Sequence, residues 1–358
     1  MKRNIGIDAL KIVSMFMVVV LHILGQGGLL EALPQFSIRY SISWFIEIMG
    51  LCSVNCFAMV TGYLNADKKY NFKGLISLWL QVIFYSIIMV LVVKLVYPDR
   101  INSYYITKMF LPTFSHSYWY FTAYFGVYLF MPLLNVVIQK TERKTLTNIL
   151  VLIILCVGIG GLFNSNLMWE ASGYSTIWLM IMYLLGGVYK KYKTKKEKNG
   201  LTYIFYFLLF CAIDFCIKMV VDKYFVNVDY INRLSYSTLN YSSIFLVLAS
   251  IQLFRFFEQY KPNNKYVEKI VNFLVPTSFG VYLVHVNPAV WENFMKGRFL
   301  YCTNYLSVMY IVVFFASCIG LYLLCSFIDY GRLKLFEKIK VKNFVIKVDN
   351  YLQNKFLN

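Results

Sequence analysis

The stretch "IDALKIVSMFMVVVLHILGQGG", Ile7–Gly28, is an apolar run that carries ionisable residues. A helix of about 20 apolar residues spans the hydrocarbon core of a bilayer. Lys11 and His22 are eleven positions apart, close to three helical turns, so both lie on one helix face about 16 Å apart along the axis. Asp8 lies one turn before Lys11 and can pair with its ammonium group. A simple anchor would not need these groups, since ionisable residues within a span are costly and usually functional.

Similar apolar segments recur along the whole chain of 358 residues. The sequence is 59% hydrophobic and only 15% charged, whereas soluble proteins carry about 25% charged residues. We therefore expect an all-α, polytopic membrane protein with about ten transmembrane helices. The expected domains are a membrane domain, 1–330, and a basic cytoplasmic tail, 331–358. The expected spans are residues 5–26, 40–64, 74–97, 118–139, 145–163, 174–189, 200–221, 239–257, 271–292 and 304–328.

The basic residues are distributed unevenly between the two sides of these spans. The net charge is +18, and the side that holds both termini carries 25 lysines and arginines against 7 on the other side. This asymmetry is the positive-inside pattern, which predicts cytoplasmic termini and a cytoplasmic loop at Lys190–Lys198. The charge is thus explained by topology and by contact with anionic membrane lipids, and we expect no nucleic-acid partner. A composition rich in Lys, Asn, Ile and Tyr suggests a bacterial cytoplasmic membrane.

The three histidines of the chain are all expected at similar depth, in the extracytoplasmic half of the membrane. His22 ends the first span, His116 precedes the fourth and His285 lies in the ninth. An imidazole titrates near neutral pH and suits general acid–base catalysis. The alternative is that these are buried core histidines and that Lys11 merely extends its ammonium group to the interface.

Other polar residues in the spans have weaker interpretations. Glu47 and Asn55 lie near one face of the second span and are candidates for substrate binding. Asp214 and Lys218 are four positions apart, which predicts a structural ion pair. The eight cysteines indicate neither a disulfide nor a metal site, and we expect no metal. Aromatic residues near the span ends fit an interfacial belt, although a few could line a sugar-binding cleft; these candidates are Trp119, Tyr120 and Tyr282.

Four segments, in order, resemble the integral-membrane acyltransferase-3 family. Lys11 and His22 have the spacing of its Arg-x10-His motif, with lysine in place of arginine. The segment "CFAMVTGYL" resembles the family's second-span motif, "YWYFTAYFGVYLFMPLLN" resembles its Trp-containing span, and "SFGVYLVHVNP" resembles its late Tyr-Leu-x-His segment. The lysine is a departure, since it can hold a phosphate as a point charge but not through a bidentate fork.

The resemblance implies a membrane O-acyltransferase, most often an O-acetyltransferase, that uses acetyl-CoA from the cytoplasm. Its acceptor would be a hydroxyl of a cell-surface polysaccharide or a lipid-linked glycan precursor. His22 would be the general base or a transient acyl carrier, and Lys11, positioned by Asp8, would bind a CoA phosphate. His285 and His116 would assist proton transfer or line the acceptor site. The alternative from another class is a transporter or flippase for a glycan or small anion.

Overall fold

The computed structural model describes most of the chain and consists of helices and connecting loops in the described part. The described residues are 3–115, 117–162, 169, 171–193, 199–225, 227, 228, 231 and 237–356. The longer helices are α1 Ile5–Leu21, α3 Ile38–Asn65, α4 Lys73–Val96, α6 Trp119–Lys140, α7 Arg143–Leu162, α8 Thr176–Tyr192, α9 Gly200–Tyr224, α11 Ile244–Gln259, α12 Lys265–His285, α14 Ser307–Lys338 and α15 Val341–Phe356. The short ones are η1 His22–Gln26, α2 Leu29–Ala32, η2 Pro98–Arg100, α5 Ser103–Phe110, η4 Ala171–Gly173, α13 Pro288–Val290, η5 Trp291–Met295 and η6 Leu300–Asn304.

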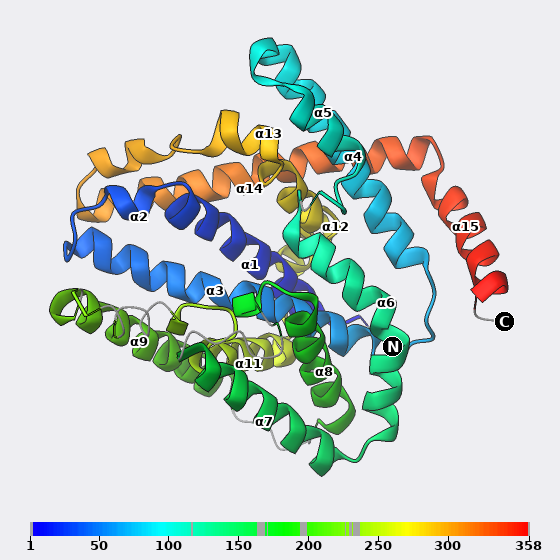
Figure 1. Cartoon of the computed structure of the whole chain (residues 1–358), viewed down its shortest axis with the longest axis horizontal. Coiled ribbons are helices and arrows are strands. Elements are labelled where there is room, and N and C mark those ends of the chain that lie inside the picture. Colours follow the sequence, from blue (N-terminus) through cyan, green and yellow to red (C-terminus); the bar gives the residue numbers. More distant parts are fainter. Residues whose placement is uncertain are drawn as a thin grey trace.

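Ten helices occupy the places of the ten predicted spans, and the all-α, polytopic prediction is confirmed. Eight of them, counted within the described residues, are long and apolar enough to cross a membrane. Figure 1 shows α1 inside the bundle, and α1 contacts α3, α12, α11 and α14. The helix that carries Asp8 and Lys11, α1, is therefore central to the fold.

The two remaining helices, α8 and α11, are shorter than a full span. With 17 and 16 residues they are about 26 and 24 Å long, less than the thickness of about 30 Å of the hydrocarbon core. They pack against α3, where glycines allow close approach: a Cβ at Gly62 would lie 1.9 Å from the Tyr183 carbonyl oxygen. Gly62 therefore allows the two helix backbones to approach closely. A matching contact places Gly186 against the Met59 carbonyl oxygen.

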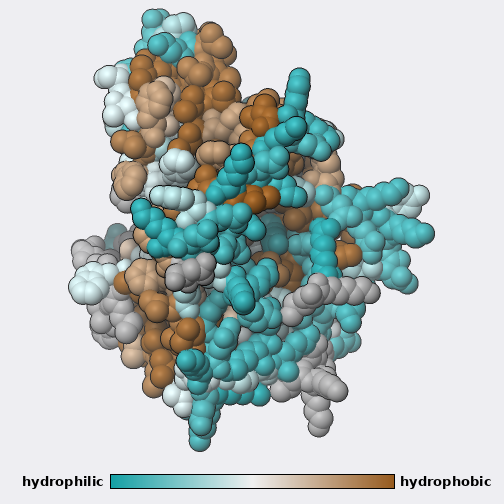
Figure 2. Space-filling model, turned by 90° about the vertical axis from the view of Figure 1, so that its right-hand side faces the viewer, coloured by the Kyte–Doolittle hydropathy of each residue, from teal (hydrophilic) through white to brown (hydrophobic). Residues whose placement is uncertain are grey.

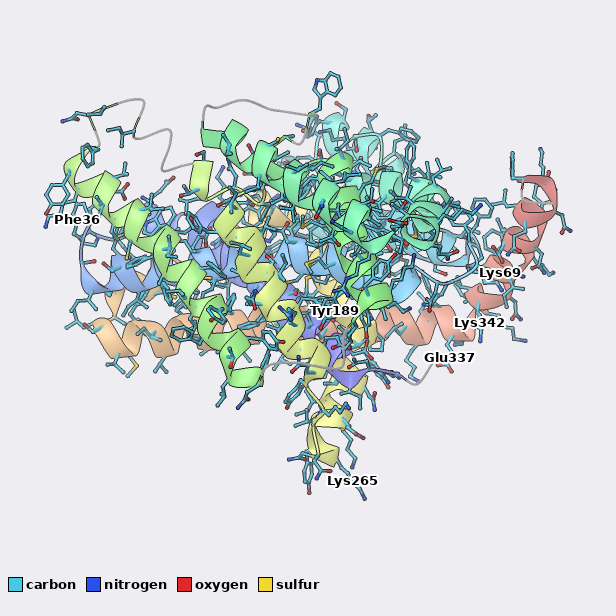
Figure 3. All side chains as sticks on the ribbon, turned by 90° about the horizontal axis from the view of Figure 1, so that it is seen from below. Phe36, Lys69, Tyr189, Lys265, Glu337 and Lys342 are labelled. Carbon is cyan, nitrogen blue, oxygen red and sulfur yellow. The ribbon has the colours of Figure 1, made fainter. Side chains whose placement is uncertain are left out.

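The loops predicted to lie on the basic side meet at one end of the bundle, which we call the basic end. There Lys190 pairs with Asp67 at 2.5 Å, and Lys191 Nζ donates to the Ile138 carbonyl at 2.7 Å. Figure 3 shows Lys69 at this end and Phe36 at the opposite end. Residues 194–198 of the predicted basic loop lie outside the described part.

The predicted boundary between residues 330 and 331 lies inside α14, which continues unbroken to Lys338. A buried ion pair, Asp329 with Arg332 at 2.7 Å, crosses the expected boundary. The separate element is α15, which docks on the start of α4 by accepting a hydrogen bond from the Phe72 backbone N–H at Asp349 Oδ1. Figure 2 faces the side of the molecule with α15 and shows hydrophilic residues over the centre and the right, with hydrophobic ones toward the top and the lower left.

Candidate functional site

A cavity of about 310 Å³ runs along the first helix, between α1, α3, α6 and α12. Its lining extends from Lys11 to Gln26, fifteen positions that cover about 22 Å along a helix axis. The cavity therefore connects the basic end with the region of the histidines. Further polar and aromatic lining residues are His22, Thr61, Asn65, Trp119, Tyr120, Tyr124, Tyr174, Tyr241, Ser278 and Tyr282.

His22 and His285, 263 positions apart in the sequence, are hydrogen-bonded to each other. His22 Nδ1 lies 2.8 Å from His285 Nε2, and His285 Nδ1 lies 2.5 Å from the Val281 carbonyl oxygen. A carbonyl oxygen only accepts, so His285 Nδ1 carries a proton, and in a neutral ring its Nε2 accepts. His22 Nδ1 is then the donor, which leaves His22 Nε2 as an unprotonated acceptor. This chain of bonds fixes the tautomer that a general base requires.

His22 begins a π-helical turn, η1, which interrupts the regular helix at the end of the cavity. Such single π-turns are common at functional sites. A Cβ at Gly25 would lie 2.6 Å from Glu47 Oε1, so the turn packs closely against this carboxyl group and a larger residue would displace it. Trp291 packs edge-on against the His22 ring, with 5.7 Å between the centroids. The imidazole is thus held on two sides, by Trp291 and by His285.

Lys11 lines the cavity at its basic end and is held by Asp8. Its ammonium group lies 3.0 Å from Asp8 Oδ1, and Arg3 Nε lies 2.5 Å from the other carboxylate oxygen. Arg3 also donates to Asn272 on α12 at 2.5 Å. The Lys11 side chain is 27% exposed, so its charge remains accessible. The predicted positioning of Lys11 by Asp8 is present in the structure, with Arg3 as an unpredicted third member.

A second lysine, Lys68, lies near the basic end of the cavity, which forms its mouth. In the sequence Lys68 was only one of the 25 basic residues counted on that side. Its Nζ donates to Asn65 Oδ1 at 3.4 Å, and Asn65 lines the cavity. Burial, then the nearby Lys190 ammonium group, lowers the pKa of Lys68. The hydrogen bond from Lys190 lowers the pKa of Asp67. The mouth therefore gathers several cations, which suits a polyanionic ligand.

The opposite end of the cavity is lined by a cluster of aromatic rings. The ring centroid of Trp119 lies 4.6 Å from that of Tyr174. Trp119 also stacks on Tyr241, with 6.1 Å between the ring centroids. Trp119, Tyr120 and Tyr282 were predicted from their places near span ends, whereas Tyr174 and Tyr241 were missed. Both missed residues lie in the connections before α8 and α11, at the start of the predicted spans 174–189 and 239–257. Their place near a span end did not distinguish them from the many other aromatic residues found there.

Asn55 and Glu47, two residues predicted to bind substrate, lie in different surroundings. Asn55 is fully buried between helices, where it donates to the Tyr241 carbonyl at 2.8 Å and accepts from Trp178 Nε1 at 2.9 Å. Its amide is committed to packing and does not line the cavity, so we no longer assign it to substrate binding. Glu47 adjoins the π-turn, and its Oε2 has no hydrogen-bond partner among the described residues. His116 lies outside the described residues.

The predicted ion pair between Asp214 and Lys218 is wrong. Lys218 pairs with Asp222, one turn closer to the membrane surface, and its ammonium group lies 4.1 Å from the centroid of the Trp44 ring. Lysine extends its charge toward the interface, which explains the choice of Asp222. Within the described part of the chain, no group of three His, Cys, Asp or Glu residues could hold a metal ion.

Comparison with known proteins relates the chain to a family. A family model described as an acyltransferase domain matches residues 4–332, which include the cavity and both paired histidines. Neither the curated proteins nor the solved structures that were searched gave a match. With nearly its whole length matched by one family model, the chain belongs to the acyltransferase-3 family and is a membrane acyltransferase.

Proposed function

We propose that the protein is an O-acyltransferase of the bacterial cytoplasmic membrane, which transfers an acyl group, in the first instance acetyl, from cytoplasmic acyl-CoA to an extracytoplasmic glycan. The acceptor would be a hydroxyl of a cell-surface polysaccharide or of its lipid-linked precursor. The observation that carries this proposal is the cavity, which connects an accessible lysine to a histidine whose Nδ1 is bonded to His285, so that its Nε2 is the unprotonated nitrogen. A hydroxyl on one side of the membrane and a thioester on the other can meet only through such a passage.

The donor binds from the basic end, which the excess of lysine and arginine assigns to the cytoplasm. Lys11 and Lys68 face the CoA phosphates, and charge-assisted bonds of this kind are the stronger class of hydrogen bond. The thin pantetheine arm then follows the cavity along α1. His22 lies about 16 Å from Lys11 along this axis, so the thioester reaches the imidazole while the nucleotide stays outside.

His22 acts as the general base for the acceptor hydroxyl. Its Nε2 takes the hydroxyl proton while the oxygen attacks the thioester carbon and forms the new C–O bond. His285 accepts from His22 Nδ1 and orients the ring, and it stabilises the imidazolium that forms. When the C–S bond breaks, the proton passes from His22 to the CoA sulfur, so the base is regenerated.

The acceptor enters from the opposite end, where aromatic rings predominate. Binding sites for small molecules commonly combine aromatic walls with few polar groups. The rings of Trp119, Tyr174 and Tyr241 offer flat apolar faces to the C–H face of a sugar ring. The carboxyl group of Glu47, beside the π-turn, is a candidate partner for sugar hydroxyls.

The test uses inside-out membrane vesicles, which expose the basic end if it is cytoplasmic. [¹⁴C]Acetyl-CoA is added outside, and label is measured in base-labile esters of the glycan fraction. We expect label to appear with the protein and to be absent from vesicles that lack it. A transporter would consume no thioester, so unchanged acetyl-CoA in active vesicles would contradict the proposal.

A further inference from the structure

The helix α15 lies at the basic end and is attached to the rest of the protein through one face. Figure 1 shows α15 turning sharply away from the end of α14, and Figure 3 shows Lys342, its second residue, at the basic end. The residues that α15 buries are Val345 and Asp349. Asp349 accepts a hydrogen bond from the Phe72 backbone N–H at 2.7 Å, and its other carboxylate oxygen lies 3.6 Å from the Lys73 ammonium group. These contacts determine which face of α15 is turned away from the bundle.

The face of α15 opposite to these contacts carries lysines and aromatic residues in alternation. Phe344, Lys347, Tyr351 and Lys355 follow one another at intervals of three or four positions, so they form a single stripe along the helix. Asp349 is two positions from both Lys347 and Tyr351, which places it on the other side of the helix. Phe344 and Tyr351 are 54% and 62% exposed, and both lysines are exposed as well. We call these four residues the outer stripe.

The outer stripe is positively charged, with no negative charge beside it on its own helix. Asp349 is the one carboxylate of α15, and it is fully buried on the face that packs against the bundle. The ammonium group of Lys355 lies 5.9 Å from the centroid of the Tyr351 ring, so cation and ring form one continuous surface. Exposed rings are unfavourable in water, whereas the lysines attract anions. The outer stripe therefore suits a partner that is both anionic and partly apolar.

The attachment of α15 places the outer stripe beside the membrane. The helix follows α14 after two residues, and Asp349 holds the residue that precedes α4. Because α14 and α4 are both long and apolar enough to cross a membrane, α15 is kept at the level where two spans enter the bilayer. At this level aromatic rings favour the interface, and ammonium groups favour anionic headgroups. A helix that joins both kinds of residue on one face is typical of segments that lie in the headgroup region.

We propose that the outer stripe of α15 binds anionic phospholipids of the leaflet at the basic end. Phe344 and Tyr351 insert their rings into the interface, and Lys347 and Lys355 contact the lipid phosphates. The lipids then hold α15 from one side, while Asp349 holds the start of α4 from the other. The binding does not depend on the acyl-transfer reaction, so its test uses no activity measurement.

The test uses the full chain in nanodiscs that hold one copy each, with Tyr351→Trp as a fluorescent probe in the stripe. The bilayer is an equal mixture of phosphatidylglycerol and phosphatidylcholine, and one of the two lipids is brominated at a time. The signal of the chain without the substitution is subtracted, because it contains six native tryptophans. We expect brominated phosphatidylglycerol to quench the added tryptophan at least about fivefold more than brominated phosphatidylcholine, which is the enrichment that one lysine near the surface provides.

A matched pair of double variants assigns this preference to the stripe. Lys347→Gln with Lys355→Gln should bring the quenching ratio close to one. Lys265→Gln with Lys269→Gln removes the same charge from exposed lysines at the start of α12, which Figure 3 shows well away from α15. This control should leave the ratio unchanged.

Four results would overturn the proposal. Quenching by neither lipid would show that the stripe faces water, and equal quenching by both would show that it does not select anionic lipid. An equal loss of preference in the α12 control would assign the effect to general surface charge. A shielded tryptophan found only in nanodiscs that hold two copies would make the stripe a contact between chains.

Discussion

At the basic end of the cavity Lys11 is 27% exposed and touches a single carboxylate, whereas at the opposite end His22 and His285 are 8% and 1% exposed and bonded to each other. The first end offers charge on flexible side chains in contact with solvent. The second offers fixed geometry on buried side chains. Recognition of a phosphate needs charge near a given place, while proton transfer needs one nitrogen in one orientation. We therefore expect the basic end to tolerate conservative substitutions that the histidine end does not.

The largest effect is expected at His22. His22→Gln removes the base but keeps a polar side chain of similar size. Turnover should fall by about 100- to 10,000-fold, the usual contribution of a positioned general base, while the KM for acetyl-CoA stays nearly constant. Both parameters are measured by steady-state kinetics, and normal membrane insertion of the variant is the control. A well-folded His22→Gln protein with full activity would make His22 a core residue.

His285 should matter less, because it acts through His22. In His285→Ala the imidazolium of His22 loses its hydrogen-bond acceptor, and bonds to charged groups contribute about 1.5–3 kcal/mol. We expect kcat to fall by roughly 10- to 100-fold, with a pH–rate profile displaced relative to wild type, since the partner of the titrating base is gone. An unchanged pH profile with normal kcat would show that the pairing has no part in catalysis.

At the basic end the effect should appear in KM. Lys11→Ala removes one charge-assisted phosphate contact, so the KM for acetyl-CoA should rise by roughly 10- to 100-fold with kcat almost unchanged. Lys11→Arg should retain most activity, because either cation supplies the charge. Were Lys11→Ala to fold normally with an unchanged KM, the lysine would only extend its charge to the interface.

The smallest effect is expected at Lys68, which faces the solvent side of the mouth. Exposed charge pairs contribute only about 0.2–1 kcal/mol, so Lys68→Ala should raise KM by about two- to fivefold. The effect should shrink at high salt, since screening weakens exposed charges. Lys69→Ala, one residue further along the same loop, is the matched control, and an equal change there would assign the effect to general surface charge.

The same contrast explains what the sequence could and could not predict. Hydrophobic runs predicted the helices, and helical spacing placed Lys11 and His22 on one face, because these features are local. The bond between His22 and His285 depends on helices 263 positions apart, so the sequence predicted their depth but not their contact. Asp214 was misassigned because both Asp214 and Asp222 are four positions from Lys218. Only the direction of the lysine side chain decides which carboxylate it pairs with. The π-turn at His22 was not predicted either; it packs against Glu47, a residue of another helix.

The most direct test of the account is a structure with a non-hydrolysable thioether analogue of acetyl-CoA, determined by electron cryomicroscopy. We predict phosphates beside Lys11 and Lys68 and the pantetheine arm along α1. The acyl carbon should then lie near His22 Nε2, leaving a space for an acceptor oxygen at the reacting distance of about 3–3.5 Å. An analogue bound outside this cavity, or with its phosphates beside Trp119 and its acyl group toward Lys11, would contradict the account.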